Sequence, residues 1–249
     1  MSSTWKACRR TPRTGISALR SSSCSRARGA KVAIASRKLE SCEQLAAQIT
    51  AQGGTAAAIA CHVGEWDALE GVVDAVQVRF GRLDVLINNA GMSPTADSLL
   101  ATSEALFDKI IDINLKGPLR LTAVAATRMG RTGGGSIINI SSLASLKPTP
   151  LTTVYSAAKA GLNALTRASA QEYAPLGVRV NCIVCGTFDT DATAGFVRNP
   201  AVLAEVVKPI ALQRVGTAGE VVGAALYFAS AASSYTTGAI INIDGGVMP

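Results

Sequence analysis

The sequence predicts one α/β domain, a doubly wound parallel sheet of about seven strands with helices on both faces. From residue 30 onward, short apolar runs alternate with longer amphipathic segments, which is the order that repeated β-α units produce. At 249 residues the chain can bury one substantial core, and no linker or internal repeat divides it. Hydrophobic residues make up 48% of it, yet no apolar run approaches the roughly 20 residues of a transmembrane helix, so we expect no membrane span.

The strands are predicted from short apolar runs that are bounded by polar residues or glycine. In chain order they lie at Lys31–Ala35, Ala56–Cys61, Leu83–Asn88, Ser136–Ser141, Val178–Ile183 and Ala239–Asp244. A further strand is needed before Gly29, and no apolar run supplies it. The sequence therefore predicts a sheet whose first strand and following turn are anomalous.

The helices are predicted from the amphipathic stretches between these strands. They lie near 39–52, 66–80, 102–129, 153–174 and 218–230. Gly53 and Gly81 follow two of them, as helix C-terminal caps do. The stretch from Gly186 to about Ala201 is longer than an ordinary strand-to-helix turn. Such loops often cover sites, and the alternative is a solvated connection or a short helix pair without a catalytic role.

The net charge of +7 is concentrated at one end of the chain. Residues 1–39 hold ten Lys or Arg and no acid, whereas the remainder holds 14 basic and 17 acidic residues. A folded domain that binds nucleic acid needs a basic face, and the chain after residue 39 has more acidic than basic residues. Binding through the basic N-terminal segment alone is the remaining alternative. We therefore expect no nucleic-acid partner.

The six cysteines lie scattered at positions 8, 24, 42, 61, 182 and 185, without the dense spacing of a small disulfide-rich domain. This pattern is typical of reduced thiols and predicts a cytoplasmic protein. Cys182 and Cys185 form a C-x-x-C pair, but no second pair accompanies it, and His62 is the one histidine in the chain. No metal site is expected.

The strongest chemical signal is the pair Tyr155 and Lys159 near the start of the helix predicted over 153–174. Their i, i+4 spacing puts both side chains on one helix face, where the lysine cation is expected to lower the tyrosine pKa from about 10 toward working pH. Taken alone, the pair also fits a solvated helix face. Ser142 favours a catalytic site, because it ends an apolar strand and can donate a hydrogen bond to the same substrate oxygen.

With these residues in place, the chain over about residues 29–247 resembles the short-chain dehydrogenase/reductase family, and within it the NADP-preferring, carbonyl reductase-like members. The run Asn88-Asn89-Ala90-Gly91 is similar to the family's turn beside the cofactor, which implies that its last three residues bind the cofactor. Asn114 matches the helical asparagine that holds a water in the family's proton relay. The resemblance implies a Rossmann-like fold and an oxidoreductase.

The resemblance also implies a mechanism in which hydride passes directly between the nicotinamide of NADP(H) and a ketone or secondary alcohol. Tyr155 would exchange the proton and contact the cofactor, while Ser142 orients the oxygen. Lys159 would lower the tyrosine pKa and bind the nicotinamide ribose. Asn114 and a water would connect Lys159 to solvent. A small carbonyl or alcohol substrate and a homotetramer or homodimer are implied, with no metal.

Cofactor preference depends on the residues that follow the strand Lys31–Ala35. In a dinucleotide fold, an acid at this point binds the adenosine 2′-hydroxyl and repels a 2′-phosphate. The chain has Ser36, Arg37 and Lys38 instead, a hydroxyl and two cations that suit a phosphate dianion. We therefore expect NADP rather than NAD, the alternative being that Arg37 points into water.

Two further cofactor contacts follow from the resemblance. Gly186, Thr187 and Thr190 match residues that approach the nicotinamide amide and the phosphates. His62 precedes Val63 at the point where the family commonly has an aspartate that accepts a hydrogen bond from the adenine amino group. A neutral imidazole can also accept one, so His62 and Val63 are expected to border the adenine. The alternative is that His62 is a partly exposed residue at a strand end.

Residues 1–28 form an anomalous basic segment before the rest of the domain at 29–249. A dinucleotide fold needs a first strand and a Gly-rich turn here, and the segment contains neither. A mitochondrial transit peptide is one explanation. We favour a shifted reading frame across part of residues 8–28. One possible set of codons for Leu19–Ala27, when read in another frame, encodes Ala-Ile-Val-Glu-Leu-Leu-Ala-Arg, which is an amphipathic helix.

A third explanation is that the cofactor turn has been lost. The chain would then be a catalytically inactive relative that binds nucleotide poorly and serves as a structural or regulatory partner in an oligomer. Binding of NADPH separates this alternative from the NADP-dependent enzyme, because serine side chains cannot replace backbone amides aimed at the pyrophosphate.

Overall fold

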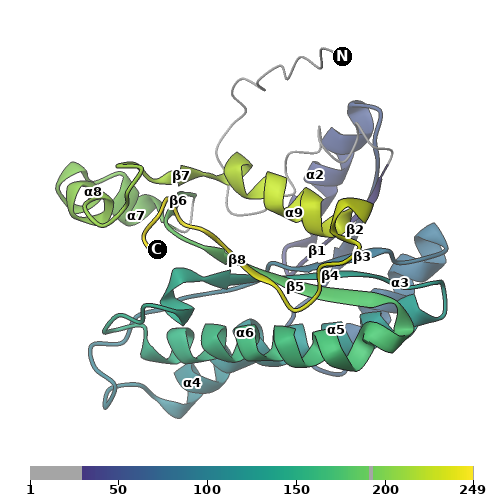
Figure 1. The fold of residues 1–249 in the computed structure, drawn as a ribbon, viewed down its shortest axis with the longest axis horizontal. Helices are drawn as coiled ribbons and strands as arrows, with labels where there is room; N and C mark the ends of the chain where they lie inside the picture. The colour runs from purple at the N-terminus through teal and green to yellow at the C-terminus, as the bar shows by residue number, and fades with distance from the viewer. Residues whose placement is uncertain (1–29, 191–192, 249) are drawn as a thin grey trace.

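A parallel sheet lies between two layers of helices (Figure 1). The structure is a computed structural model that describes residues 30–190 and 193–248, apart from the side chain of Phe196. The main strands are β1 (Lys31–Ser36), β2 (Thr55–Ala60), β3 (Val85–Asn88), β4 (Gly135–Ser142), β5 (Val178–Cys185) and β8 (Ile240–Ile243). Each strand placed from the sequence is present, and the predicted doubly wound α/β class is confirmed.

Every pairing in the sheet is parallel. Strands β3, β4, β5 and β8 are joined in that order, and β1 pairs with β2. Within the described ranges no pairing joins β1 to β3. The strand expected before Gly29 lies outside those ranges, as does the whole anomalous segment 1–28. A short extra pair joins β6 (Phe188–Asp189) to β7 (Gly216–Thr217).

Helices cover both faces of the sheet (Figure 1). One face carries α3 (Ala68–Phe80), α4 (Glu104–Ile111), α5 (Gly117–Gly130) and α6 (Thr153–Tyr173). The other carries α2 (Leu39–Ala51) and α9 (Val222–Ala229). The irregular stretch that follows β5 contains β6 and the short helix α7 (Ala194–Val197), and α8 (Pro200–Val207) follows. The stretch thus contains one short helix and leads into a second one.

The helix predicted over 102–129 is interrupted by a π-helical turn, Asp112–Lys116. Ser103 caps the start of α4, where its hydroxyl accepts a hydrogen bond from the Leu106 amide at 3.2 Å. Beyond the π turn, α5 begins with proline in its first turn, where a missing N–H loses no helical hydrogen bond. Such turns widen a helix locally and frequently occur at functional sites, and Asn114 lies within this one.

The core consists of two apolar layers, one on each face of β4 and β5. On one face Ile138 and Ile183 pack against Phe228 of α9. On the other, Ile137 packs against Met129 of α5. These side chains are fully buried. Strands covered on both faces explain the continuous apolar runs from which they were predicted.

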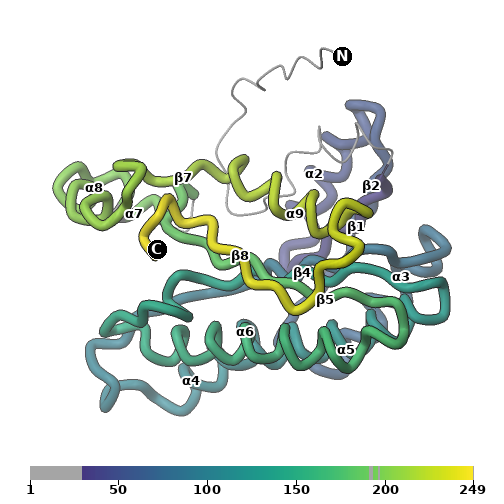
Figure 2. The backbone as a smooth tube through the Cα atoms, viewed as in Figure 1, coloured from purple at the N-terminus to yellow at the C-terminus, as the bar shows by residue number. Residues whose placement is uncertain are grey.

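Arg179 of β5 attaches the chain beyond α9 to the sheet. Its guanidinium donates a hydrogen bond to the carbonyl oxygen of Phe228 at 2.9 Å. Asn181 donates to the carbonyl oxygen of Thr236 at 2.9 Å and accepts from the Ala239 amide at 3.0 Å. From there β8 runs beside β5 (Figure 2), and after β8 the Gly245 carbonyl oxygen accepts a hydrogen bond from the Leu212 amide at 3.0 Å.

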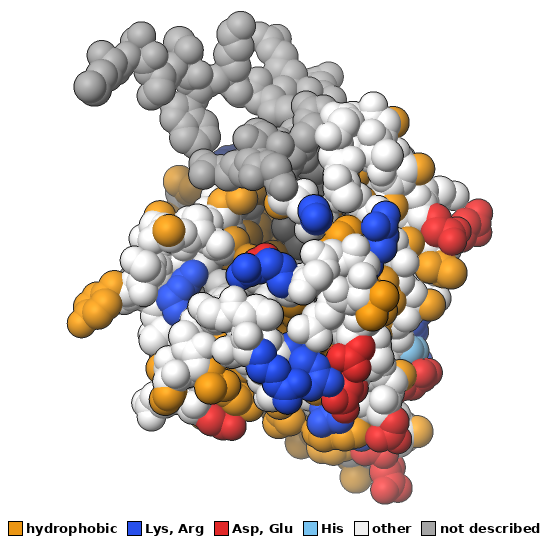
Figure 3. Space-filling model, turned by 90° about the vertical axis from the view of Figure 1, so that its right-hand side faces the viewer, with side chains coloured by type: hydrophobic (Ala, Val, Ile, Leu, Met, Phe, Trp, Pro, Cys, Tyr) orange, Lys and Arg blue, Asp and Glu red, His pale blue; other side chains and the backbone are white. Residues whose placement is uncertain are grey.

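Charged side chains of both signs are interspersed on the face shown in Figure 3. The described residues drawn on that face form no continuous basic field. Ion pairs join opposite charges elsewhere in the chain, as between Arg128 and the carboxylates of Glu70 and Asp74. Across residues 30–190 and 193–248, no helix combines the length and the apolar character that crossing a membrane requires.

Gly117 allows α5 to begin against the loop that follows β2. A Cβ atom at this position would clash with the carbonyl oxygen of Val63, a backbone atom that cannot rotate away. We expect Gly117→Ala to lower the free energy of unfolding by about 1–3 kcal/mol, the usual effect of overpacking. Urea denaturation of the two proteins measures this difference.

The matched control is Gly71→Ala in α3, because an added Cβ there meets nothing within 4 Å. Alanine is the better helix former, so this variant should equal the unmodified protein in stability or exceed it by about 0.5–1 kcal/mol. Equal destabilisation by both substitutions would show that the contact with Val63 is not the cause.

Candidate active site

Three of the predicted site residues meet at the carboxyl edge of the sheet. Ser142 ends β4, Tyr155 lies in the first turn of α6, and Lys159 lies one turn further along. The Ser142 hydroxyl lies close enough to the Tyr155 phenol to lower its pKa. The Nζ atom of Lys159 lies 5.8 Å from the centroid of the Tyr155 ring. The structure therefore brings together the groups that the sequence spacing singled out.

The pKa of Tyr155 lies above its usual value. Burial of the phenol raises it, and the nearby Ser142 hydroxyl lowers it only in part. The sequence analysis predicted the opposite direction from the positive charge of Lys159, and for this structure that prediction is wrong. Desolvation of the phenolate outweighs the stabilisation that its neighbours provide, so Tyr155 carries its proton at neutral pH.

Lys159 is a buried cation with 4% of its surface exposed. Its ammonium donates a hydrogen bond to the carbonyl oxygen of Ile140 at 2.9 Å, and no carboxylate in the described ranges forms an ion pair with it. Burial lowers its pKa to about 8. The Lys159 backbone is held as well, since the Ser141 hydroxyl donates to its carbonyl oxygen at 3.3 Å.

Asn114 and Lys159 both approach Gly91. A Cβ atom on Gly91 would lie 3.1 Å from Asn114 Oδ1 and 3.5 Å from Lys159 Nζ. The Asn114 amide donates to the carbonyl oxygens of Met92 and Ile110, both at 2.9 Å, and Asn114 Oδ1 accepts from the Met92 amide at 3.3 Å. Asn114 is therefore fixed between the π turn and the loop that follows β3.

A buried polar ladder, which the sequence analysis did not predict, supports these residues. Asn88 at the end of β3 donates to Asn139 Oδ1 at 2.8 Å, and Asn139 donates to Thr166 Oγ1 at 2.9 Å. Asn139 and Thr166 are fully buried. The ladder links β3, β4 and α6. Its signal in the sequence is an asparagine inside the apolar run Ile137–Ile140, where a polar side chain needs a buried partner.

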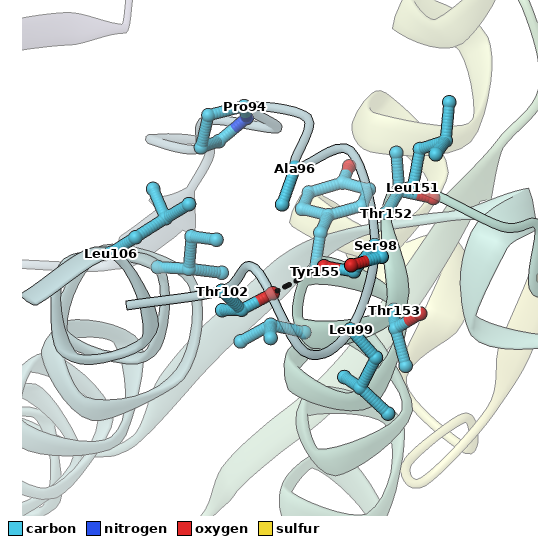
Figure 4. Close-up of a pocket in the computed structure, with 12 residues that line it drawn as sticks. Pro94, Ala96, Ser98, Leu99, Thr102, Leu106, Leu151, Thr152, Thr153 and Tyr155 are labelled. Atoms are coloured by element: carbon cyan, nitrogen blue, oxygen red, sulfur yellow. Dashed lines mark hydrogen bonds between the residues drawn. The ribbon is translucent and has the colours of Figure 1, made fainter. Parts of the chain in front are cut away.

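A small hollow lies beside the Tyr155 ring (Figure 4). Its walls come from the loop before α4, from α4 and from the start of α6, and comprise Pro94, Ala96, Ser98, Leu99, Thr102, Leu106, Ile110, Leu151, Thr152, Thr153, Val154 and Tyr155. The Ala96 amide donates to the Leu151 carbonyl oxygen at 3.1 Å and ties two of the walls together. None of the lining side chains is charged. With a volume of about 10 Å³, the hollow is nearly closed.

A second hollow, of about 490 Å³, lies where β1 and β2 end. Its lining includes Arg37, Cys61, His62 and Glu65. The Cys61 amide donates to the Ser36 carbonyl oxygen at 3.0 Å and holds the two strand ends together. The hydroxyl of Ser36 accepts from the Lys38 amide at 3.3 Å. Of the predicted cofactor residues in this region, Arg37 and His62 line the hollow, and Ser36, Lys38 and Val63 do not.

The predicted residues after β5 lie where the chain crosses to β6. A Cβ atom on Gly186 would lie 2.6 Å from the Cα atom of Asp244, so glycine is required here for packing. The carbonyl oxygen of Thr187 accepts from the Gly216 amide at 2.9 Å. The hydroxyl of Thr190 lies 3.0 Å from that of Thr193, which closes a hydrogen-bonded turn.

The C-x-x-C pair does not form a shared site. Cys185 lies three positions after Cys182 on β5, so their side chains lie on opposite faces of the sheet. Burial raises the pKa of Cys182 to about 11 and that of Cys185 to about 12, which keeps both thiols protonated. The part of the chain that the structure describes holds no group of His, Cys, Asp and Glu able to bind a metal.

The buried Lys159 makes stability depend on pH. Its pKa is about 8 in the folded chain against an ordinary 10.5, so burial of the charge costs about 3 kcal/mol below pH 8, at ~1.4 kcal/mol per pH unit. Between these values the unfolded chain binds more protons than the folded one, and stability therefore rises with pH.

We expect the unmodified protein to gain stability relative to Lys159→Met from pH 8 to 10. Urea unfolding of both proteins at each pH tests this, and a difference independent of pH would contradict it.

Fold and site together define a doubly wound α/β protein with tyrosine, lysine and serine at the carboxyl edge of its sheet, and known proteins match it. The family model described as Enoyl-(Acyl carrier protein) reductase matches residues 15–248. An uncharacterized oxidoreductase of Thermotoga maritima is 40% identical over 223 residues, or 88% of each chain. Dehydrogenase/reductase SDR family member 4 of Bos taurus is 33% identical over 218 residues, 88% of this chain and 78% of the relative.

Solved structures agree with these matches. A gluconate 5-dehydrogenase of Burkholderia cenocepacia in complex with NADP and tartrate superposes with a TM-score of 0.88 at 30% identity, covering 94% of this chain and 91% of that one. A short-chain type dehydrogenase/reductase of Mycobacterium marinum gives 0.86 at 33% identity, with the same coverage of 94% and 91%. The chain belongs to the short-chain dehydrogenase/reductase family of oxidoreductases, as its motifs predicted.

Proposed function

We propose that the protein transfers hydride between NADP(H) and a ketone or secondary alcohol, with Tyr155 as the general acid and base. One observation carries the proposal. The Ser142 hydroxyl lies close enough to the Tyr155 phenol to lower its pKa, and the Lys159 ammonium lies 5.8 Å from the Tyr155 ring centroid, beside a hollow that has no charged lining. A neutral carbonyl compound whose oxygen reached Tyr155 and Ser142 would find two hydrogen-bond donors, and the hollow of about 10 Å³ beside Tyr155 would have to widen to admit the rest of it.

In the reductive direction Tyr155 donates its proton to the substrate oxygen. The phenol is protonated at neutral pH, as a proton donor must be, and its raised pKa makes it a weaker acid than a tyrosine with a pKa near the working pH. Ser142 donates to the same oxygen and stabilises the negative charge that develops on it. Oxidation of an alcohol needs the reverse transfer, in which Lys159 stabilises the phenolate. Bound NADP(H) supplies or accepts the hydride at its nicotinamide ring.

Lys159 and Asn114 would connect Tyr155 to solvent. With a pKa of about 8, Lys159 can take up and release a proton near neutral pH. Asn114 Oδ1 and Lys159 Nζ both lie close to Gly91, and a water that bridged the two side chains would complete the relay. Lys159 would also bind the nicotinamide ribose, next to the cofactor turn formed by Asn89, Ala90 and Gly91.

The preference for NADP rests on the hollow at the ends of β1 and β2. Arg37 lines it, and the positions after β1 that would carry an acid for NAD hold Ser36, Arg37 and Lys38. A guanidinium can donate two charge-assisted hydrogen bonds to a phosphate dianion, whereas its contact with an uncharged 2′-hydroxyl is weaker. The solved gluconate 5-dehydrogenase relative contains NADP.

The remaining assignments complete the proposal. His62 and Val63 would border the adenine, and Gly186, Thr187 and Thr190 would approach the nicotinamide amide and the phosphates. A homotetramer or homodimer in the cytoplasm is proposed, together with one domain over 29–249 after the anomalous segment. The comparisons give no support to a catalytically inactive subunit. Binding of NADPH and the intact mass of the protein test that alternative and the shifted reading frame.

Tyr155→Phe tests the catalytic assignment. Removal of the phenolic proton donor should lower the rate of ketone reduction by NADPH about 10²–10⁴-fold, because positioned acid–base catalysis contributes that much. The dissociation constant of NADPH should stay unchanged. Consumption of NADPH with a panel of ketones measures the first, and NADPH fluorescence titration measures the second.

Tyr173→Phe, the same substitution at the far end of α6, is the matched control. It should keep the rate within about twofold, because Tyr173 packs against the core away from the site and phenylalanine keeps its ring. Full activity in Tyr155→Phe would remove this residue from the mechanism.

Arg37→Ala tests the cofactor preference. Loss of a charged hydrogen bond to the 2′-phosphate should raise the dissociation constant of NADPH about 10–100-fold and leave that of NADH almost unchanged. Fluorescence titration of both nucleotides measures the two constants. Arg131→Ala, an exposed arginine at the end of α5, is the control and should change neither. Equal weakening of NADPH and NADH by Arg37→Ala would contradict a specific contact with the 2′-phosphate.

A further inference from the structure

His62 has one of its two ring nitrogens already committed. The Gly64 amide donates a hydrogen bond to His62 Nδ1 at 3.2 Å, within the turn that follows β2. A nitrogen that accepts in this way carries no hydrogen, so in the neutral ring the hydrogen lies on Nε2. The free nitrogen of His62 is therefore a hydrogen-bond donor. The sequence analysis expected an acceptor, and the contact with Gly64 corrects that expectation.

The fold places His62 near Arg37. Strands β1 and β2 run parallel with Ser36 opposite Ala60, so the residues that follow each strand come out side by side. Both Arg37 and His62 line the same hollow. In NADP the 2′-phosphate and the purine are attached to neighbouring carbons of one ribose. A 2′-phosphate held by Arg37 therefore brings the purine to the side of the hollow that His62 lines.

We infer that His62 presents a hydrogen-bond donor to the carbon-6 edge of the purine, so that this position does not select the 6-amino group of adenine. The inference rests on the proposed binding of NADP. An aspartate, as the family commonly has here, would accept from the amino group and require it. His62 presents the opposite polarity and favours a purine with an acceptor at carbon 6.

Adenine and hypoxanthine have opposite hydrogen-bond polarity at carbon 6, so they can test this inference. Adenine carries an amino donor at carbon 6, whereas hypoxanthine carries a carbonyl oxygen, which is an acceptor. The two bases also differ at ring nitrogen 1. Other groups, such as the carboxylate of Glu65 in the same hollow, can contact this nitrogen. Such contacts affect the selectivity of every variant equally. A change in selectivity on substitution of His62 alone reports the polarity of this residue.

The experiment measures how the full chain binds adenosine 2′,5′-bisphosphate and inosine 2′,5′-bisphosphate, by titration calorimetry. These probes carry the 2′-phosphate and the base without the nicotinamide, so the readout does not depend on turnover. The proteins compared are the unmodified chain, His62→Asn and His62→Asp. Asparagine and aspartate both offer an oxygen to the Gly64 amide and have the same shape. Their remaining atom donates in asparagine and accepts in aspartate.

We expect His62→Asn to keep the adenosine-to-inosine selectivity of the unmodified protein within about threefold. His62→Asp should shift that selectivity toward adenosine about 10–100-fold, since it replaces a mismatched donor by a charged acceptor. A shift toward adenosine in His62→Asn as large as in His62→Asp, or equal selectivity in all three proteins, would overturn the inference.

The control for the proposed function is built into the same titrations. If neither bisphosphate binds the unmodified chain at millimolar concentration, NADP binding itself fails and the inference fails with it. If both bind and Arg37→Ala weakens both equally, the 2′-phosphate site stands, and the His62 substitutions alone decide the polarity of the base contact.

Discussion

The site depends on one constraint, that the parallel strands end at a common edge of the sheet. Ser142 at the end of β4 is opposite Cys185 at the end of β5, and Asn88 at the end of β3 is opposite Asn139. Segments far apart in the chain thereby meet at the carboxyl edge of the sheet, and the residues that follow each strand lie around the same site. Without this register, Ser142 could not meet a tyrosine on the next helix.

Helix α6 is held to that edge by polar contacts as well as by apolar packing. Lys159 donates to Ile140, Ser141 donates to the Lys159 carbonyl, and Asn139 donates to Thr166. Hydrogen bonds of this kind are directional, and in a buried setting an unmade one is costly. They therefore set the rotation and the position of the helix along its axis, which apolar contacts alone define less narrowly. The alignment of Tyr155 with Ser142 follows from them.

The same arrangement lowers the stability of the fold. Lys159 is a buried cation without a carboxylate partner, and burial keeps its pKa near 8. The π turn at Asp112–Lys116 departs from regular helix geometry to place Asn114 beside Gly91. Departures of this kind persist at functional sites because the surrounding core supports them. Here the core is the pair of apolar layers on β4 and β5.

The sequence by itself determined the order of strands and helices, the common helix face of Tyr155 and Lys159, and the absence of an acid after β1. These features depend on residue spacing within one element, and that spacing is local. The tertiary structure alone decided the direction of the Tyr155 pKa, the ladder through Asn139 and Thr166, and the polarity of His62. Burial and most hydrogen bonds of this kind join segments distant in the chain, and for His62 the backbone conformation of one turn decides which nitrogen is free. Neither can be read from the order of residues.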